Sequence, residues 1–84
     1  MKKSILILGL PGSGKTTKMN EILSTQNTVF FKDEVVSCEE IENVHSAALK
    51  ANSFCIVATQ LDLKELSQNV LSNFEILDLN AVVS

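Results

Sequence analysis

Apolar runs of strand length alternate with segments of helical spacing along the whole 84-residue chain. The run at residues 5–8 places apolar side chains at successive positions, which is typical of a strand that is covered on both faces. The predicted strands are, in chain order, residues 4–8, 28–31, 53–59 and 74–79. Strands that alternate with helices predict right-handed crossovers and a mostly parallel sheet. We therefore expect an α/β fold in three layers, with a four-stranded sheet between two layers of helix.

Three helices are predicted between these strands. The first, residues 15–24, follows a glycine-rich loop, and the second begins at Ser37, whose hydroxyl forms a capping box with Glu40. The third begins at Asp62, another residue type that favours the N-cap position. Apolar residues at helical spacing follow each start, and we expect them to face the core: Met19, Ile22 and Leu23, then Ile41, Val44, Ala48 and Leu49, and last Leu63, Leu66, Val70 and Leu71.

Composition narrows the class of protein. The length allows a single domain, residues 1–84, and the core must be aliphatic because the chain has four Phe but neither Trp nor Tyr. No apolar run approaches the roughly 18 residues of a transmembrane helix, so we expect a cytoplasmic protein with no membrane contact. Cys38 and Cys55 lack the spacing of a metal site, and we expect Cys55 to be a buried free thiol.

The charge balance limits the partners that the chain can bind. The net charge is −3, and all seven basic residues are lysines. A protein of this charge has no global basic field for a nucleic-acid backbone, so contact with DNA needs a local patch such as Lys2, Lys3 and Lys18. Without arginine, the chain supplies neither a bidentate phosphate clamp nor an arginine finger to itself.

Residues 9–16, Gly-Leu-Pro-Gly-Ser-Gly-Lys-Thr, fit the pattern G-x-x-x-x-G-K-[ST] between a predicted strand and a predicted helix. Gly12 and Gly14 let successive backbone N–H groups turn inward around an anion, and the helix N-terminus favours phosphate. Lys15 can reach the β- and γ-phosphates, and the hydroxyl of Thr16 suits Mg²⁺. The motif resembles that of the P-loop NTPases, which implies ATP and Mg²⁺ as ligands. The predicted nucleotide-binding residues are Gly9, Pro11, Gly12, Ser13, Gly14, Lys15, Thr16 and Thr17.

Asp33 and Glu34 follow the apolar residues of the predicted second strand, a pattern that resembles a Walker B strand. The resemblance implies that Asp33 joins Thr16 around Mg²⁺ and that Glu34 polarises the attacking water. Gln60 ends the third predicted strand, where its amide is expected to contact the γ-phosphate or the attacking water. The predicted catalytic residues are thus Lys15, Glu34 and Gln60, and the predicted metal ligands are Thr16 and Asp33.

The order of these motifs, from Asp33 and Glu34 through a helix to Thr59 and Gln60, is similar to that of the FtsK–HerA superfamily of DNA-pumping ATPases. This resemblance implies a DNA-handling ATPase that packages or translocates DNA, with the strand order 2-3-1-4. It also implies a homo-oligomer or a complex with a larger partner, because a neighbour's arginine completes the site in such rings. This chain has no arginine to offer a second copy of itself, so a lysine or a different partner must fill that role, or hydrolysis is slow.

Two alternative functions remain open. The loop is also similar to those of small polynucleotide- and gluconate-type kinases, which implies transfer of the γ-phosphate to a nucleoside, polynucleotide or metabolite, with Asp33 near the acceptor. Those kinases carry a metal-binding acid on the strand beside the P-loop strand and use an arginine-bearing lid, and this sequence has neither feature. The third interpretation is a nucleotide-binding switch that does not hydrolyse its ligand and needs a partner.

Overall fold

The computed structural model describes residues 3–10, 12, 14–26, 28 and 30–79 of the chain. Four strands alternate there with three α-helices and one short 3₁₀ helix. The elements are, in chain order, β1 (Ser4–Leu8), α1 (Lys15–Thr25), β2 (Phe31–Val35), α2 (Cys38–Lys50), β3 (Ile56–Thr59), the 3₁₀ helix η1 (Leu63–Glu65), α3 (Gln68–Asn73) and β4 (Phe74–Asp78). None of the described helices has the length and apolar character that crossing a bilayer requires.

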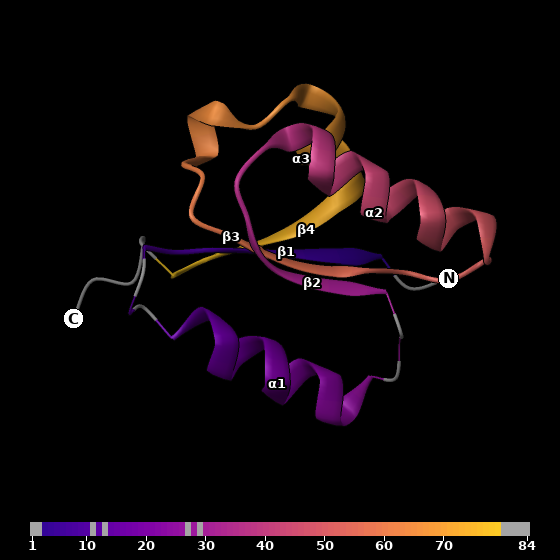
Figure 1. Ribbon diagram of the computed structural model, residues 1–84, viewed down its shortest axis with the longest axis horizontal. Helices are drawn as coiled ribbons and strands as arrows, with labels where there is room; N and C mark the ends of the chain where they lie inside the picture. Colours follow the sequence, from indigo (N-terminus) through magenta and orange to yellow (C-terminus); the bar gives the residue numbers. More distant parts are fainter. Residues whose placement is uncertain (1–2, 11, 13, 27, 29, 80–84) are drawn as a thin grey trace.

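The strands form one sheet in the order β2-β3-β1-β4, and every neighbouring pair is parallel. In β1, Ile5 pairs with Ile56 of β3 on one side and with Glu75 of β4 on the other. Helix α1 covers one face of the sheet, and α2 and α3 cover the other (Figure 1). The expected α/β class and strand order are confirmed. The carboxyl ends of the parallel strands share one edge, which is where sheets of this kind bind their ligands.

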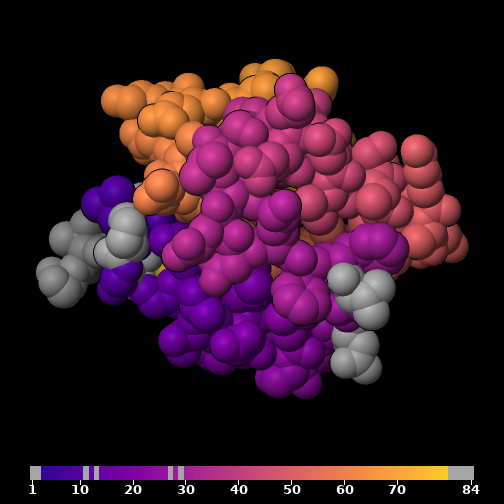
Figure 2. Space-filling model, viewed as in Figure 1, coloured from indigo at the N-terminus to yellow at the C-terminus, as the bar shows by residue number. Residues whose placement is uncertain are grey.

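An apolar cluster fills the space on each face of the sheet. The alternation of side chains along β1 sends Leu6 and Leu8 into the cluster under α2 and α3, and Ile5 and Ile7 into the cluster under α1. Met19 of α1 lies in the second cluster, as expected. In the space-filling view, α1 lies below and the orange residues, numbered in the sixties, lie above. The magenta residues of β2 and the start of α2 lie between them (Figure 2).

The second strand lies later in the chain than predicted. It spans Phe31–Val35 and not residues 28–31, so Asp33 and Glu34 lie within the strand and not after its end. The apolar pattern was misleading here because β2 is an edge strand, where polar side chains can face solvent. Phe31 is itself 51% exposed. The third strand is also shorter than the predicted residues 53–59 and begins at Ile56.

The helix predicted after Asp62 is two helices. The carboxylate of Asp62 accepts a hydrogen bond from the backbone N–H of Leu63 at 2.8 Å, but the helix that it caps is only η1. The hydroxyl of Ser67 then accepts from the N–H of Val70 and starts α3. Of the predicted apolar face, Leu66 and Val70 are buried in the core as expected, whereas Leu63 in η1 is 42% exposed.

Helix α2 begins as predicted but buries a narrower face. The hydroxyl of Ser37 accepts a hydrogen bond from the backbone N–H of Glu40 at 3.3 Å. Ile41 and Ala48 are fully buried, whereas Leu49, which was expected in the core, is 53% exposed. The short α3 covers the sheet beside α2 without reaching over Leu49, which lies in the last turn of α2 and lines an open hollow.

Candidate functional site

The glycine-rich loop joins the carboxyl end of β1 to the first turn of α1. Gly12 and Gly14 have φ angles of +85° and +91°, in the region that residues with a side chain rarely adopt. The backbone N–H of Gly9 donates a 3.2 Å hydrogen bond to the carbonyl of Thr59, which ties the start of the loop to the end of β3. The loop therefore turns sharply at the carboxyl edge of the sheet.

Helix α1 begins directly at this loop, with Gly14 at its N-cap. Among the described residues no side chain caps the helix and no acidic residue lies in its first turn, so its N-terminal N–H groups are left for an anion. Lys15 is only 8% exposed, and its ammonium donates a 3.2 Å hydrogen bond to the carbonyl of Leu10. Two predicted nucleotide-binding residues, Pro11 and Ser13, lie outside the described residues.

The carboxylate of Asp33 is held from both sides. The hydroxyl of Thr16, in the first turn of α1, donates a 2.8 Å hydrogen bond to one oxygen of Asp33. The other oxygen accepts from the backbone N–H of Glu34, also at 2.8 Å. The structure therefore brings together Thr16 and Asp33, the two residues that were predicted to share a metal ion.

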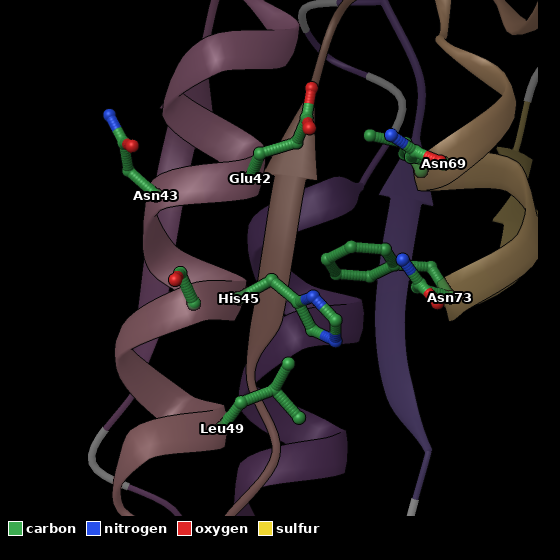
Figure 3. Close-up of a pocket in the computed structure, with 9 residues that line it drawn as sticks. Glu42, Asn43, His45, Leu49, Asn69 and Asn73 are labelled. Atoms are coloured by element: carbon green, nitrogen blue, oxygen red, sulfur yellow. The ribbon is translucent and has the colours of Figure 1, made fainter.

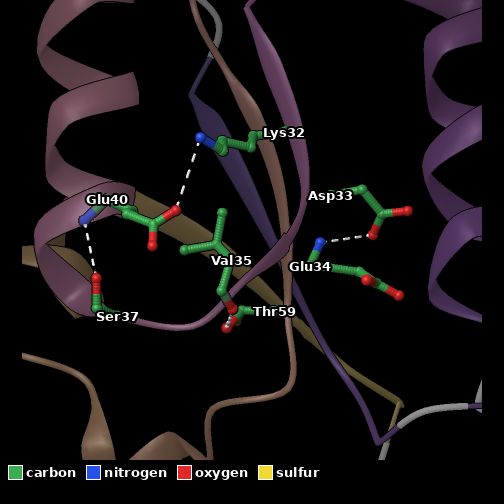
Figure 4. Close-up of polar contacts among 7 residues, drawn as sticks. All are labelled: Lys32, Asp33, Glu34, Val35, Ser37, Glu40 and Thr59. Atoms are coloured by element: carbon green, nitrogen blue, oxygen red, sulfur yellow. Dashed lines mark hydrogen bonds and ion pairs between the residues drawn. The ribbon is translucent and has the colours of Figure 1, made fainter.

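A β-bulge places Asp33 and Glu34 on the same side of the sheet. Lys32 pairs with Val57 and Val35 with Thr59, so β2 advances three residues while β3 advances two. Lys32 contacts Glu40 of α2 at 3.6 Å, and Val35 packs in the cluster under α2 and α3. Both flanking residues thus face α2, and the two carboxylates between them point away from it (Figure 4).

The bulge depends on an unusual backbone conformation at Glu34. Its φ is +55°, in the left-handed region that side chains disfavour. In a regular strand, Glu34 would face away from Asp33, because successive side chains alternate between the two faces. The left-handed residue removes this alternation at one position, so both carboxylates face the glycine-rich loop.

Two adjoining hollows lie at this edge and share Lys15 and Glu34. The first, of about 340 Å³, is lined by Gly12, Gly14, Lys15, Thr16, Thr17, Asp33 and Glu34. The second, of about 220 Å³, is lined by Lys15, Glu34, Val36 and Gln60. The first hollow gathers the predicted phosphate and metal ligands, and the second gathers the three predicted catalytic residues. Gly9, which was predicted to bind the nucleotide, lines neither hollow; it is buried, and its backbone N–H bonds to β3.

The donor set suits a metal ion that keeps most of its ligands outside the protein. Among the described residues, no three His, Cys, Asp or Glu side chains converge on one point. The hydroxyl of Thr16 and the carboxylate of Asp33 are two oxygen donors, and Mg²⁺ commonly takes one or two protein oxygens and fills its remaining positions with water and phosphate. These two residues therefore fit Mg²⁺ better than a metal that needs a complete protein cage.

A larger hollow of about 370 Å³ lies between α2 and α3, away from the loop (Figure 3). Glu42 and His45 of α2 line one wall, and Asn69 and Asn73 of α3 line the other. The His45 ring lies 4.9 Å from that of Phe74, and burial lowers its pKa below the ordinary 6.5. Its lining also includes the carboxylate of Glu42 and the hydroxyl of Ser46, but none of the residues that the sequence predicts for the site, so we assign it no chemistry.

Other candidate residues do not join the site. Cys55 is a free thiol in the core, and burial raises its pKa, which keeps it a neutral thiol without nucleophilic character. Lys3 precedes β1, whereas Lys18 lies just past the opposite end of that strand, so the predicted DNA-binding patch is not assembled from these two residues. Its third member, Lys2, lies outside the described residues.

Sequence patterns did not reveal the bulge in β2. A signal that could have indicated the bulge is the pair of adjacent carboxylates, Asp33 and Glu34, directly before Val35. Val35 is fully buried in the same short strand. Sequence reasoning also predicted no role for the side chain of Thr59, which bonds to both β2 and the turn after β3.

Comparison of the chain with models of protein families, with curated proteins and with solved structures found no match.

Proposed function

We propose that the chain binds a nucleoside triphosphate with Mg²⁺ and hydrolyses it. The observation that carries the proposal is the 2.8 Å hydrogen bond from Thr16 to Asp33 beside the uncapped N-terminus of α1. A hydroxyl and a carboxylate at this distance provide two metal-binding oxygens next to a helix end that favours phosphate. ATP is the default nucleotide, since the sequence contains no guanine-binding motif.

Each part of the first hollow has a role in this proposal. The backbone of Gly12 and Gly14 and the first N–H groups of α1 hold the phosphates, and the ammonium of Lys15 moves from the carbonyl of Leu10 to the β- and γ-oxygens. Thr16 and Asp33 would hold Mg²⁺, which when bound would neutralise part of the phosphate charge. These residues position the triphosphate with its γ-phosphate toward the second hollow.

The residues of the second hollow position the attacking water, which we call the water side of the reaction. Glu34 orients a water molecule and accepts its proton as the oxygen attacks the γ-phosphorus and the bond to the β-phosphate oxygen breaks. The exposed amide of Gln60 lies in the same hollow, where it can hydrogen-bond the water or the γ-phosphate. The products are a nucleoside diphosphate and inorganic phosphate.

DNA handling is the process that we propose for this activity, on the similarity of motif order to the FtsK–HerA superfamily. The site has no arginine of its own, and in GTPases a missing finger lowers turnover by about 10³- to 10⁵-fold. We therefore propose that a larger partner supplies the arginine, or that a lysine of a second copy takes its place. Slow turnover by the isolated chain is the expected starting point for measurements.

Phosphate release from Mg-ATP tests the proposal, measured with and without single- and double-stranded DNA. We expect Glu34→Gln to lower turnover by about 10²-fold or more, because a general base contributes roughly 10²- to 10⁴-fold. Glu75→Gln is the matched control, since it removes the same charge from an exposed position on β4. Equal turnover in both variants contradicts the role of Glu34, and failure of the native chain to bind Mg-ATP overturns the whole proposal.

A second candidate, phosphotransfer, is favoured by the size of the second hollow. Its volume of about 220 Å³ exceeds the roughly 30 Å³ that one water occupies, which leaves space for a small hydroxyl compound beside Glu34. In that reaction the alcohol replaces water, and Glu34 takes its proton. Formation of diphosphate without free phosphate in the presence of an acceptor distinguishes phosphotransfer from hydrolysis.

A further inference from the structure

The side chain of Thr59 joins two segments at the carboxyl edge of the sheet. Thr59 is fully buried, and its hydroxyl donates a 2.5 Å hydrogen bond to the carbonyl of Val35 at the end of β2. The same oxygen accepts a 3.1 Å hydrogen bond from the backbone N–H of Leu61. A single hydroxyl therefore bonds to β2 and to the turn that follows β3 (Figure 4 shows its bond to Val35).

Both partners of this hydroxyl are next to predicted catalytic residues. Val35 directly follows Glu34, and Leu61 directly follows Gln60. Glu34 and Gln60 line the same hollow, although 26 positions separate them in the chain. Their side chains make no hydrogen bond to each other among those that the structure gives for the described residues. The side chain of Thr59 thus connects the segments that carry them, in addition to the backbone pairing of β2 with β3.

The bond to Val35 also lies at the point where the bulge ends. Pairing between β2 and β3 resumes at Val35 and Thr59, immediately after the left-handed Glu34. A residue in this conformation persists only where its surroundings fix the backbone on either side. The carboxylate of Asp33 fixes the N–H of Glu34, and the hydroxyl of Thr59 fixes the carbonyl of the next residue.

We propose that Thr59 is the positioning residue that sets Glu34 and Gln60 relative to each other on the water side of the reaction. Its effect on turnover rests on the proposed hydrolysis, whereas its effect on the conformation of Glu34 does not. Thr59 is fully buried and lines neither of the two hollows. It acts by holding the carbonyl after Glu34 and the N–H after Gln60 at one point.

Three variants test this role. Thr59→Val removes the hydroxyl at similar volume, and Thr59→Ser keeps it. Thr28→Val is the matched control, because the hydroxyl of Thr28 also donates to a carbonyl, that of Phe54 at 2.7 Å, and accepts from an N–H, that of Phe30 at 3.1 Å. These two hydrogen bonds of Thr28 lie at the opposite edge of the sheet, where β2 and β3 begin.

Turnover and affinity are measured for all three variants with Mg-ATP. We expect Thr59→Val to lower kcat by about 10- to 100-fold, part of the effect of a general base, with the nucleotide Kd within about threefold of the native value. Thr59→Ser restores kcat, and Thr28→Val leaves both quantities near native. If Thr59→Val keeps native kcat, or loses affinity and turnover equally, the proposal is overturned.

Chemical shifts test the positioning without any nucleotide. The Cα and Cβ shifts of Glu34 report its backbone angles, and we expect Thr59→Val to move them toward values of an extended residue while Thr59→Ser and Thr28→Val leave them unchanged. Unchanged shifts in Thr59→Val overturn the positioning role even if turnover falls. If the shifts move but the native chain hydrolyses no nucleotide, the positioning role is supported and the proposed hydrolysis fails.

Discussion

The hydroxyl of Thr16 and the carboxylate of Asp33 meet at 2.8 Å, although 17 positions separate the two residues in the chain. Thr16 lies in the first turn of α1, and Asp33 lies in the edge strand β2, with β3 between β2 and the strand that leads into the loop. The contact therefore joins two segments of the chain whose strands, β1 and β2, are not neighbours in the sheet. It brings an oxygen pair into the hollow that Gly12 and Gly14 of the glycine-rich loop also line.

This pair predicts a metal-specific loss in Asp33→Asn. Replacing one anionic oxygen with an amide weakens a Mg²⁺ site, and we expect the affinity for Mg-ATP to fall by about 10- to 100-fold. Affinity for ATP in excess chelator should change by less than about threefold, because the loop backbone is intact. Titration calorimetry with and without Mg²⁺ measures both, with Asp62→Asn as the control at an exposed cap. Equal losses with and without Mg²⁺ contradict a metal role.

The left-handed backbone of Glu34 predicts that glycine at this position is more stabilising than alanine. A left-handed residue with a Cβ costs about 1–2 kcal/mol, whereas glycine adopts φ of +55° freely but loses about 0.5–1 kcal/mol through its unfolded-state entropy. We therefore expect Glu34→Gly to unfold with a free energy about 0.5–1 kcal/mol higher than that of Glu34→Ala. Both variants lack the carboxylate, so urea denaturation of the pair isolates the backbone effect. A more stable alanine variant contradicts the strain.

The layers and the loop were predictable from the sequence because local signals determine them. The apolar run of β1 has the same bounds in the prediction and in the structure, Ser4–Leu8, since both of its faces are covered. The glycines at 12 and 14 adopt the positive φ angles that the loop motif requires. Ser37 caps α2 through a bond within its own first turn.

The features that were not predictable depend on contacts between distant segments. The bulge in β2 arises where Val35 pairs with Thr59 and where Asp33 accepts from Thr16, and no local pattern encodes either contact. Leu49 has the spacing of a core residue, but α3 is six residues long and does not cover it. Helical periodicity describes which side chains share a face and not how much of that face a neighbour buries.

The contrast between predicted and observed burial leads to a third prediction, on stability. Leu6 of β1 is fully buried, and Leu6→Ala should lower the free energy of unfolding by about 2–5 kcal/mol. Leu49 is 53% exposed, and Leu49→Ala should change it by about 0.5 kcal/mol or less. Both substitutions delete the same atoms, so the two denaturation midpoints compare burial directly. A similar loss at both positions places Leu49 in the core and contradicts this fold.

The fourth prediction is a pH dependence that originates at His45, beside Phe74 in the hollow between α2 and α3. Burial lowers the pKa of His45 below 6.5, so the unfolded chain binds a proton there at a higher pH than the folded chain does. This contribution to stability is therefore complete above about pH 6.5 and is lost as the pH falls toward the folded pKa. In thermal unfolding from about pH 7.5 down to about pH 5, we expect the native chain to lose more stability than His45→Gln, which does not titrate. Carboxylates titrate in both chains, so parallel profiles contradict a lowered pKa of His45 in the folded chain.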